Sequence, residues 1–517
     1  MKLKHLVFAL ALTNAVLYSC VLPLWEGFDE PFHFGYVESV SVWHELPVLH
    51  QTVVSSQIRK SLTLVPLSWL LSEAIPGSIS FQQWFRLSRE EKLRRARELA
   101  SLSPALRSER SELLNYEAQQ APLAYLALVP VDRSSWAMPL RREIFRLRLF
   151  GAILATVLLY ISLTALLQKL GLPDCFQMGV LVCVFESQML WASVAHVGND
   201  WLAVPLALCF LLLLASSVAR NGIASLLALT LIFSAGLLTK AYFLAFAPVF
   251  AALIIYKRAS GLISWRAIAL LGAIPLLVAG PWYARNLIRY GSVSGTQQSA
   301  AGIGLGEVWA AIPHIPWLAS TVSFARWSLW TGNWSFVSFS RTTLNLELIL
   351  LCVSFVVYLI FFRRITQAEL WMLAACGCFV LGLVYQTCTT WLHTKGASMY
   401  PEPWYPQGII PCLWALCFSG LAAAAVPGRI ISILLCLISA WTAEVTYVAK
   451  LLPLYGSGTY ARSTWQSVWS WWVSNPTQDL QGVVLAPVST VYWLLVLFSF
   501  LLALVTGITV YRLWRGA

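Results

Sequence analysis

Residues 6–36 read LVFALALTNAVLYSCVLPLWEGFDEPFHFGY. The apolar first part is long enough to cross a bilayer, which takes about 20 residues in a helix. Two acids and a histidine, Asp29, Glu30 and His33, follow it directly. Since proline is favoured at the first helical position, Pro31 predicts a helix start, with Asp29 or Glu30 at the cap and His33 one turn further on the same face. These acids are therefore either ordinary capping residues or a chemical site at the membrane surface.

The composition of the chain is that of a membrane protein. Of its 517 residues, 58% are hydrophobic and 11% are charged, whereas soluble domains average roughly 45–50% apolar and about 25% charged residues. The formal net charge is +12, but no basic run or RNA-binding signature accompanies it. We therefore expect membrane lipids, and no nucleic acid, as partners of these cations. The eleven cysteines, most of them inside apolar stretches, are expected to be unpaired core residues.

Apolar stretches recur along the chain and predict an all-α polytopic membrane protein with about twelve transmembrane helices. The predicted spans are residues 6–24, 147–166, 176–193, 201–218, 223–238, 242–256, 267–284, 346–362, 370–386, 408–426, 429–446 and 491–511. The pair 223–238 and 242–256 could instead be one long tilted helix. If it is two spans, the flanking cations fall on one side, which the positive-inside rule makes the cytoplasm. These cations are Lys2, Lys4, Arg220, Lys257, Arg258, Arg266, Arg363, Arg364, Arg429, Arg512 and Arg515.

This topology divides the chain into seven parts, with both termini in the cytoplasm. They are the first transmembrane helix in 1–24, an extracytoplasmic first loop with the acidic motif in 25–145, transmembrane helices two to seven in 146–284, a second extracytoplasmic loop in 285–345, transmembrane helices eight to eleven in 346–446, a third extracytoplasmic loop in 447–490, and the last transmembrane helix with a cytoplasmic tail in 491–517. The large first loop is expected to contain amphipathic helices. One of them is a charged run that opens with the capping box Ser88-x-x-Glu91.

Several short motifs occur in an order that resembles the GT-C superfamily of integral-membrane glycosyltransferases. This superfamily includes protein O-mannosyltransferases of family 39 and the aminoarabinose transferases of lipid A. The resembling segments are Asp29-Glu30-Pro31-x-His33, Gln119-Gln120-Ala121-Pro122-Leu123-x-Tyr125, Asn199-Asp200, Thr239-Lys240, Trp282-x-x-Arg285-Asn286 and Arg326-Trp327-Ser328-x-Trp330-x-Gly332-Asn333-Trp334. The sequence departs from the pattern at Ala121, where a proline is usual, and at Tyr400–Tyr405, where many bacterial members carry an Arg-Tyr pair.

The resemblance implies a glycosyltransferase of the hexosyl- or pentosyltransferase kind. It would take a sugar from a polyprenyl-phosphate donor lipid and attach it to a glycan, glycolipid or protein acceptor. It also implies a multi-pass protein of the bacterial inner (plasma) membrane, with its active site on the extracytoplasmic side. Asp29 would be the base that takes the acceptor proton. Glu30 and His33 would orient Asp29 or contact a metal ion.

The remaining site residues follow from the same resemblance. Glu117, Gln119, Gln120 and Tyr125 would bind substrate. Lys240, Arg285 and Arg326 could hold the donor phosphate, because cationic side chains bind phosphate oxygens directly; snorkelling to the headgroups is the alternative for Lys240. Asp200, with His196 four residues before it, could complete a site for a divalent cation, or the two could simply lie in a polar turn.

Two other classes of protein remain open. A transporter or flippase of lipid-linked substrates would use the same cations, but it has no need of paired carboxylates in the first loop. A polymerase or ligase of lipid-linked glycans is the second alternative. The large first loop with its acidic motif favours the glycosyltransferase over both.

Overall fold

The computed structural model of the protein describes residues 3–219, 222–295, 302–332, 339–361, 365–457, 464–474 and 476–516. Five residues singled out from the sequence, Lys2, Arg220, Arg363, Arg364 and Asn333, lie outside the described residues, as does Trp334.

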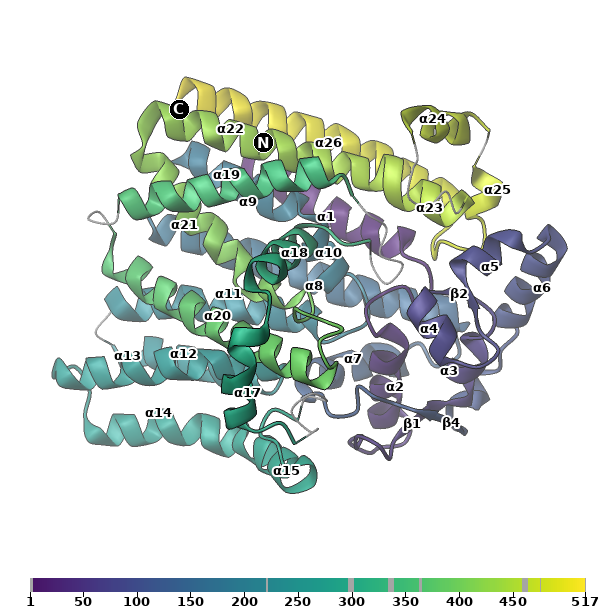
Figure 1. Ribbon diagram of the computed structural model, residues 1–517, viewed down its shortest axis with the longest axis horizontal. Coiled ribbons are helices and arrows are strands. Elements are labelled where there is room, and N and C mark those ends of the chain that lie inside the picture. The colour runs from purple at the N-terminus through teal and green to yellow at the C-terminus, as the bar shows by residue number, and fades with distance from the viewer. Residues whose placement is uncertain are drawn as a thin grey trace.

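Long apolar helices run side by side through most of the molecule (Figure 1). Among the described residues, eight helices are long and apolar enough to cross a membrane. They are α1 (Leu3–Val21), α8 (Leu140–Lys169), α11 (Asp200–Ala219), η2 with α13 (Ala241–Phe246 and Ala247–Ala259), α19 (Arg341–Ile360), α20 (Gln367–His393), α22 with its continuations η7 and α23 (Ala425–Val445, Thr446–Leu451 and Leu452–Ser457), and α26 (Val488–Arg515).

Two further apolar segments are bent. Helices α9 (Asp174–Glu186) and α10 (Gln188–Val194) meet at 57°, and α14 (Trp265–Val278) and α15 (Gly280–Tyr290) meet at 49°. The second bend has a clear cause, because Pro281 lies in the first turn of α15 and its ring cannot fit a continuous helix. If each bent pair is one span, the described residues hold ten spans.

The predicted all-α membrane architecture is confirmed, and each predicted span lies on an apolar helix. The two remaining spans correspond to α12 (Ile223–Leu237) and α21 (Ile410–Ala423), which are shorter than the ~20 residues of a typical span. The count of twelve therefore stays a prediction. The doubtful pair does consist of two separate helical segments, since the backbone of Lys240 between them is extended, with φ −154° and ψ 135°.

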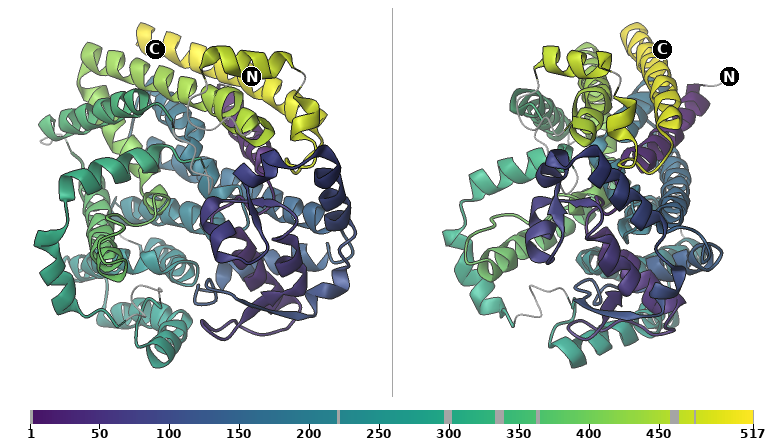
Figure 2. Two further views of the ribbon diagram at one scale, coloured as in Figure 1. Left: turned by 45° about the vertical axis from the view of Figure 1, so that its right-hand side comes forward. Right: turned by 90° about the vertical axis from the view of Figure 1, so that its right-hand side faces the viewer.

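The first loop forms a small mixed unit at one end of the bundle, on the right in Figure 1 and facing the viewer in the right-hand view of Figure 2. Two short two-stranded sheets join its helices, antiparallel β1–β4 and parallel β2–β3. Its elements are α2 (Glu30–Ser41), β1 (Val53–Ser55), α3 (Ser56–Ser61), β2 (Pro66–Leu67), α4 (Trp69–Ala74), β3 (Ile79–Ser80), α5 (Phe81–Arg86), α6 (Arg89–Ala100), η1 (Pro104–Arg107), β4 (Arg110–Leu114) and α7 (Leu123–Arg133). Half of the predicted capping box forms at α6: Ser88 accepts a hydrogen bond from the Glu91 amide at 3.2 Å, whereas the Glu91 carboxylate binds Arg94 and Arg95.

Shorter helices fill the later connections. They are α17 (Leu305–Ala311), η3 (Ile312–His314), α18 (Trp317–Leu329), η6 (Tyr405–Gly408), α24 (Trp465–Val473) and α25 (Thr477–Leu480). Helices α24 and α25 lie at the same end of the bundle as the first loop, whereas the C-terminal end of α26, with Arg512 and Arg515, lies at the opposite end (Figure 1).

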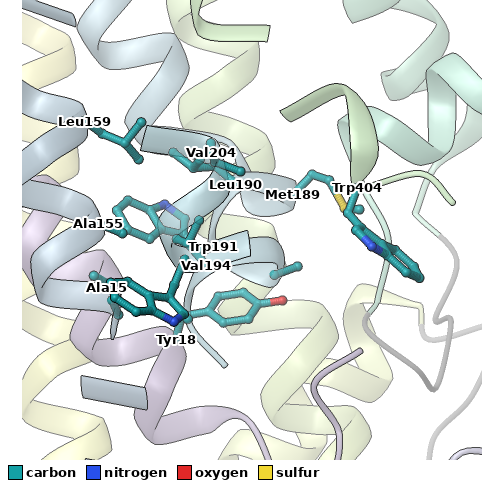
Figure 3. Close-up of a cluster of buried hydrophobic side chains, with 14 of the residues drawn as sticks. Ala15, Tyr18, Ala155, Leu159, Met189, Leu190, Trp191, Val194, Val204 and Trp404 are labelled. Carbon is teal, nitrogen blue, oxygen red and sulfur yellow. The ribbon is translucent and has the colours of Figure 1, made fainter. Parts of the chain in front are cut away.

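A continuous apolar core joins the first loop to the bundle. Part of it is drawn in Figure 3, where Met189 and Trp191 of α10 lie with Tyr18 of α1, Ala155 of α8 and Trp404. Trp404 also stacks on Phe28 of the first loop, with ring centroids 4.1 Å apart. The core thus fixes the residue that precedes Asp29. All eleven cysteines are free, and most are buried as expected, but Cys352 is exposed.

Candidate active site

The structure places Asp29 at the start of α2, but not as a side-chain cap. Its backbone is left-handed, with φ 54° and ψ 16°, and its carboxylate makes no capping hydrogen bond to the helix. The Tyr116 hydroxyl donates to the Asp29 carboxylate instead. Because burial and the Asp29 charge raise the pKa of Tyr116 well above its ordinary value, this phenol keeps its proton and remains a donor. The capping interpretation is therefore wrong for the Asp29 side chain.

Glu30 has a structural position. It forms a fully buried ion pair with Arg148 of α8, and its Oε1 also accepts from the Val197 amide at 3.0 Å. Arg148 donates in addition to the carbonyls of Leu22 and Pro23, at 2.6 and 2.8 Å. These bonds fix both sides of the Asp29 turn. Glu30 thus holds the backbone around Asp29, and its carboxylate is occupied by Arg148 rather than turned to a ligand.

His33 lies one turn along α2 and is buried. Its Nδ1 and the Tyr125 hydroxyl are hydrogen-bonded at 2.7 Å, and the Tyr125 ring stacks on Tyr36 with centroids 4.0 Å apart. Burial, followed by the charges of His196 and Lys240, holds the pKa of His33 well below its ordinary value. The imidazole is therefore neutral at pH 7. The structure thereby brings together two predicted site residues, His33 and Tyr125, from segments far apart in the sequence.

Lys240 and Asp200 form a buried ion pair. The Lys240 Nζ donates to both Asp200 oxygens, at 2.7 and 2.6 Å. The expected cation site of Asp200 and His196 gains no third ligand, since no group of three His, Cys, Asp or Glu side chains in the described ranges could hold a metal ion. The residues near Asp200 do not fit a metal centre in this arrangement, and we assign no step to one.

Gln120 connects Glu117 with the turn that contains Asn199 and Asp200. The Gln120 amide nitrogen donates to Glu117 at 2.6 Å, and the Gln120 oxygen accepts from Asn199, next to Asp200, at 3.0 Å. Burial and the Asp29 charge raise the pKa of Glu117 well above its ordinary value. Gln119 is buried as well, and its side-chain oxygen has no hydrogen-bond partner among the residues that the structure describes.

Glu402 completes the group, although sequence reasoning did not select it. Desolvation by the surrounding protein and the Asp29 charge raise its pKa to about 7, whereas Lys240 lowers it; the side chain itself is still exposed to solvent. Its neighbour Tyr405 places its ring 5.0 Å from the Lys240 ammonium. The sequence showed only that Tyr400–Tyr405 departs from the family pattern, which gives no sign that Glu402 lies near enough to Asp29 for their charges to interact.

We call Asp29, Glu117, Asp200 and Glu402 the acid cluster; its cation is Lys240. Burial is the main reason that the pKa of Asp29 rises to about 6, against the lowering effect of Tyr116 and Lys240. Because the pKa values of Asp29, Glu117 and Glu402 are all raised, part of the cluster keeps its protons close to neutral pH. The cluster can therefore both accept and donate a proton, as general acid–base chemistry requires.

A pocket of about 230 Å³ opens beside the acid cluster. Its polar end is formed by Lys240, Gln120 and Tyr405, and its lining elsewhere is largely apolar. The apolar part runs between η2 and α20 and is lined by Leu244, Ala245, Phe379, Gly382 and Leu383. A ligand with a charged head and a hydrocarbon tail fits this division.

Two predicted phosphate ligands lie elsewhere. Arg285 donates to the carbonyl of Pro47 at 2.5 Å and stacks on Trp282, 4.4 Å from the ring centroid. Arg326 donates to Asn345 at 2.6 Å. Neither lines the pocket beside Lys240. The structure therefore brings Asp29, Glu117, Gln120, Asp200 and Lys240 together and leaves both arginines outside that group.

Fold and site define a polytopic membrane protein with an acid cluster beside a mostly apolar pocket that carries Lys240 at its polar end. Among solved structures, the chain is similar to the crystal structure of ArnT from Cupriavidus metallidurans bound to undecaprenyl phosphate. The two chains are 13% identical with a TM-score of 0.48, over 98% of this chain and 77% of that one. Neither a protein-family model nor a curated protein sequence matches this chain.

Proposed function

We propose that the protein is a membrane glycosyltransferase that transfers a sugar from a polyprenyl-phosphate donor to an extracytoplasmic glycan, glycolipid or protein. The observation that carries this proposal is the Lys240 ammonium at the polar end of a pocket with apolar walls, close enough to the Asp29 carboxylate to lower the pKa of that group. An enzyme of this kind needs those parts together: a base, a cation for phosphate, and a groove for a lipid chain. The protein would act in the bacterial inner membrane with the acid cluster facing outward.

In the proposed reaction, an acceptor hydroxyl attacks the anomeric carbon of the donor sugar. The bond between that carbon and the phosphate oxygen breaks, and the lipid phosphate leaves with the electron pair. Asp29 takes the proton of the attacking hydroxyl. Lys240 would stabilise the negative charge on the departing phosphate, since only two of its three donors are used by Asp200. A protonated Glu402 could return a proton to the product phosphate.

The substitution Asp29→Asn tests the base. Asparagine tolerates a left-handed backbone, and its amide oxygen can still accept from Tyr116, so the turn is expected to fold normally. An amide cannot take up the proton. General-base catalysis contributes roughly 10²- to 10⁴-fold, so sugar transfer in purified protein should fall by at least about a hundredfold.

Donor binding separates this outcome from the transporter and ligase alternatives. Asp29→Asn protein should still bind a polyprenyl-phosphate sugar within a few-fold of the unaltered chain, because Lys240 and the apolar groove remain. Transfer within a few-fold of the unaltered rate would remove Asp29 as the base. Movement of donor lipid across vesicles without any transfer would favour the flippase.

A further inference from the structure

A second and larger pocket, of about 790 Å³, opens on the outside of the bundle. It lies between the first turns of α8 and the segment that leads into α26, and its lining includes Arg141, Arg142 and Arg146 from α8 together with Gly482 and Ser489. No acidic side chain is among the described residues that line it. The pocket is therefore strongly cationic.

The three arginines differ in how far their donors are used. Arg141 donates to the carbonyls of Gly482 and Val484, and so joins the two sides of the pocket. Arg142 is exposed and makes no side-chain hydrogen bond or ion pair with any residue that the structure describes. Arg146 has only long contacts, 3.4–3.5 Å, to Ser134 and Met138. Two guanidinium groups are thus available to a ligand.

Arg146 also lines a neighbouring pocket of about 430 Å³ between α7 and α8, so it is reached from two sides. No residue of the acid cluster lines either of these two pockets. Arg148, two residues further on, is fully buried against Glu30. Because successive residues of a helix are about 100° apart, the side chains of Arg146 and Arg148 leave α8 on nearly opposite faces. The cationic pocket is therefore separate from the acid cluster.

Exposed apolar side chains continue from the pocket along both helices. On α26 they are Trp493, Val496 and Phe500, which are 76%, 60% and 62% exposed and follow Ser489 at helical spacing. On α8, Ile153 and Ile161 are 39% and 59% exposed. Both helices pack against α1. The surface below the pocket thus suits hydrocarbon chains, in the part of the bundle that lies within the membrane.

We propose that this pocket binds the phosphate of an anionic phospholipid from the leaflet at the first-loop end of the bundle. The free donors of Arg142 and Arg146 would hold the phosphate oxygens, since guanidinium groups form paired charge-assisted bonds to phosphate. The acyl chains would lie on the exposed apolar side chains of α26 and α8. The bound lipid would rest on the seam that Arg141 closes between residues 482–484 and α8.

The test uses the full-length protein in neutral detergent, with added phosphatidylglycerol, phosphatidylcholine or inorganic phosphate. Thermal unfolding and native mass spectrometry report stabilisation and retained lipid. Phosphatidylglycerol should raise the Tm and stay bound, and the other two additives should not. In Arg142→Gln/Arg146→Gln the affinity for phosphatidylglycerol should fall at least about tenfold, the usual scale for a lost charge-assisted bond. Arg141 is left unchanged because its bonds are structural.

Lys169→Gln is the matched control, because it removes one exposed cation from the far end of the same helix. It should bind phosphatidylglycerol like the unaltered chain. If the double variant does not fold, Arg142→Gln alone serves, since this exposed side chain has no contact to lose. Equal stabilisation by both phospholipids, or unchanged phosphatidylglycerol binding in the arginine variants, would overturn the proposal. If only inorganic phosphate raised the Tm, the ligand of the pocket would be a free anion and the lipid proposal would be wrong.

Discussion

At the scale of single residues, Asp29 combines an unusual backbone with an unusual environment. A left-handed conformation is uncommon outside glycine and is best tolerated by asparagine and aspartate. Here it turns the carboxylate away from α2 and toward Tyr116. A residue that only capped the helix would point the other way. The conformation and the raised pKa of about 6 both suit a base that works near neutral pH.

The pH profile of transfer follows from that pKa. Only the ionised Asp29 accepts a proton, so kcat/KM should decline below about pH 6, approaching tenfold per unit. Tyr116 lowers the pKa of Asp29, so Tyr116→Phe should move this acidic limb to higher pH. Tyr290→Phe is the control, since its hydroxyl accepts from the Leu49 amide, outside the acid cluster. A limb that stays in place in Tyr116→Phe would show that another group controls it.

Lys240 pairs with Asp200 in the structure and is proposed to bind the donor phosphate, and a pair of variants can separate these two roles. Lys240→Ala leaves the Asp200 carboxylate buried without its partner, which typically costs about 3–5 kcal/mol. The double variant Asp200→Asn/Lys240→Ala removes both charges and should recover most of the Tm. Donor KM should remain roughly ten- to a hundredfold raised in both variants, because the phosphate has lost its cation. A double variant with normal donor KM would mean that Lys240 serves only to pair with Asp200.

At the scale of elements, two buried arginines hold α2. Arg148 binds Glu30 in its first turn. Arg107, from η1, binds Glu38 in its last turn at 2.9 Å, and it also binds Asp132 of α7 and Glu143 of α8, at 2.7 and 2.6 Å. Burial raises the pKa of Glu38 to about 7, although Arg107 lowers it. One guanidinium among three acids thus joins four helical segments and fixes the orientation of α2.

Arg107→Met should therefore unfold the first loop at a lower temperature. Breaking a buried ion pair by removing one partner typically costs about 3–5 kcal/mol, because the acids left behind are buried and unpaired. Arg94→Met is the matched control. Arg94 makes exposed ion pairs within α6, and such pairs contribute about 0–1 kcal/mol. Similar Tm values for the two variants, measured on purified protein, would contradict the anchoring role of Arg107.

At the scale of the whole molecule, the orientation in the membrane is open to direct measurement. Glu90, Ala310 and Ser260 are exposed and can each be replaced by a single cysteine. The exposed native Cys352 should first be replaced by serine. A membrane-impermeant thiol reagent should reach the first two from outside the cell and the third only after the membrane is opened. Labelling of position 260 from outside would refute the twelve-span topology and place Lys257 and Arg258 on the wrong side.

The sequence predicts this fold well because apolar runs and their flanking charges are local signals. Each predicted span lies on an apolar helix, and only α12 and α21 are too short to settle the count. Small sheets in the first loop were not expected, since three of their four strands, β1, β2 and β3, have only two or three residues. Such short strands carry no period that could be recognised.

The site was predictable only in part. Asp29, Gln120 and Lys240 were found through short motifs, and the structure groups them. The pairing of Lys240 with Asp200 and of Glu30 with Arg148 depends on how helices pack, and neither is visible from residue types. Glu402 was missed for the same reason, since the Asp29 charge that raises its pKa comes from another part of the chain. Arg285 and Arg326 fitted the expected chemistry but bind other groups in the structure.

The ion pair of Glu30 and Arg148 also has a bearing on how the chain is made. The two residues are separated by 118 positions, so the ribosome finishes Glu30 long before Arg148 exists. At roughly 5–20 residues per second, the delay is about 6 to 24 seconds. In the predicted topology, the Asp29 turn would wait beyond the translocon during that time, without the guanidinium that binds Glu30 and the carbonyls of Leu22 and Pro23. We therefore expect the turn to take its final shape only after α8 has been synthesised and inserted.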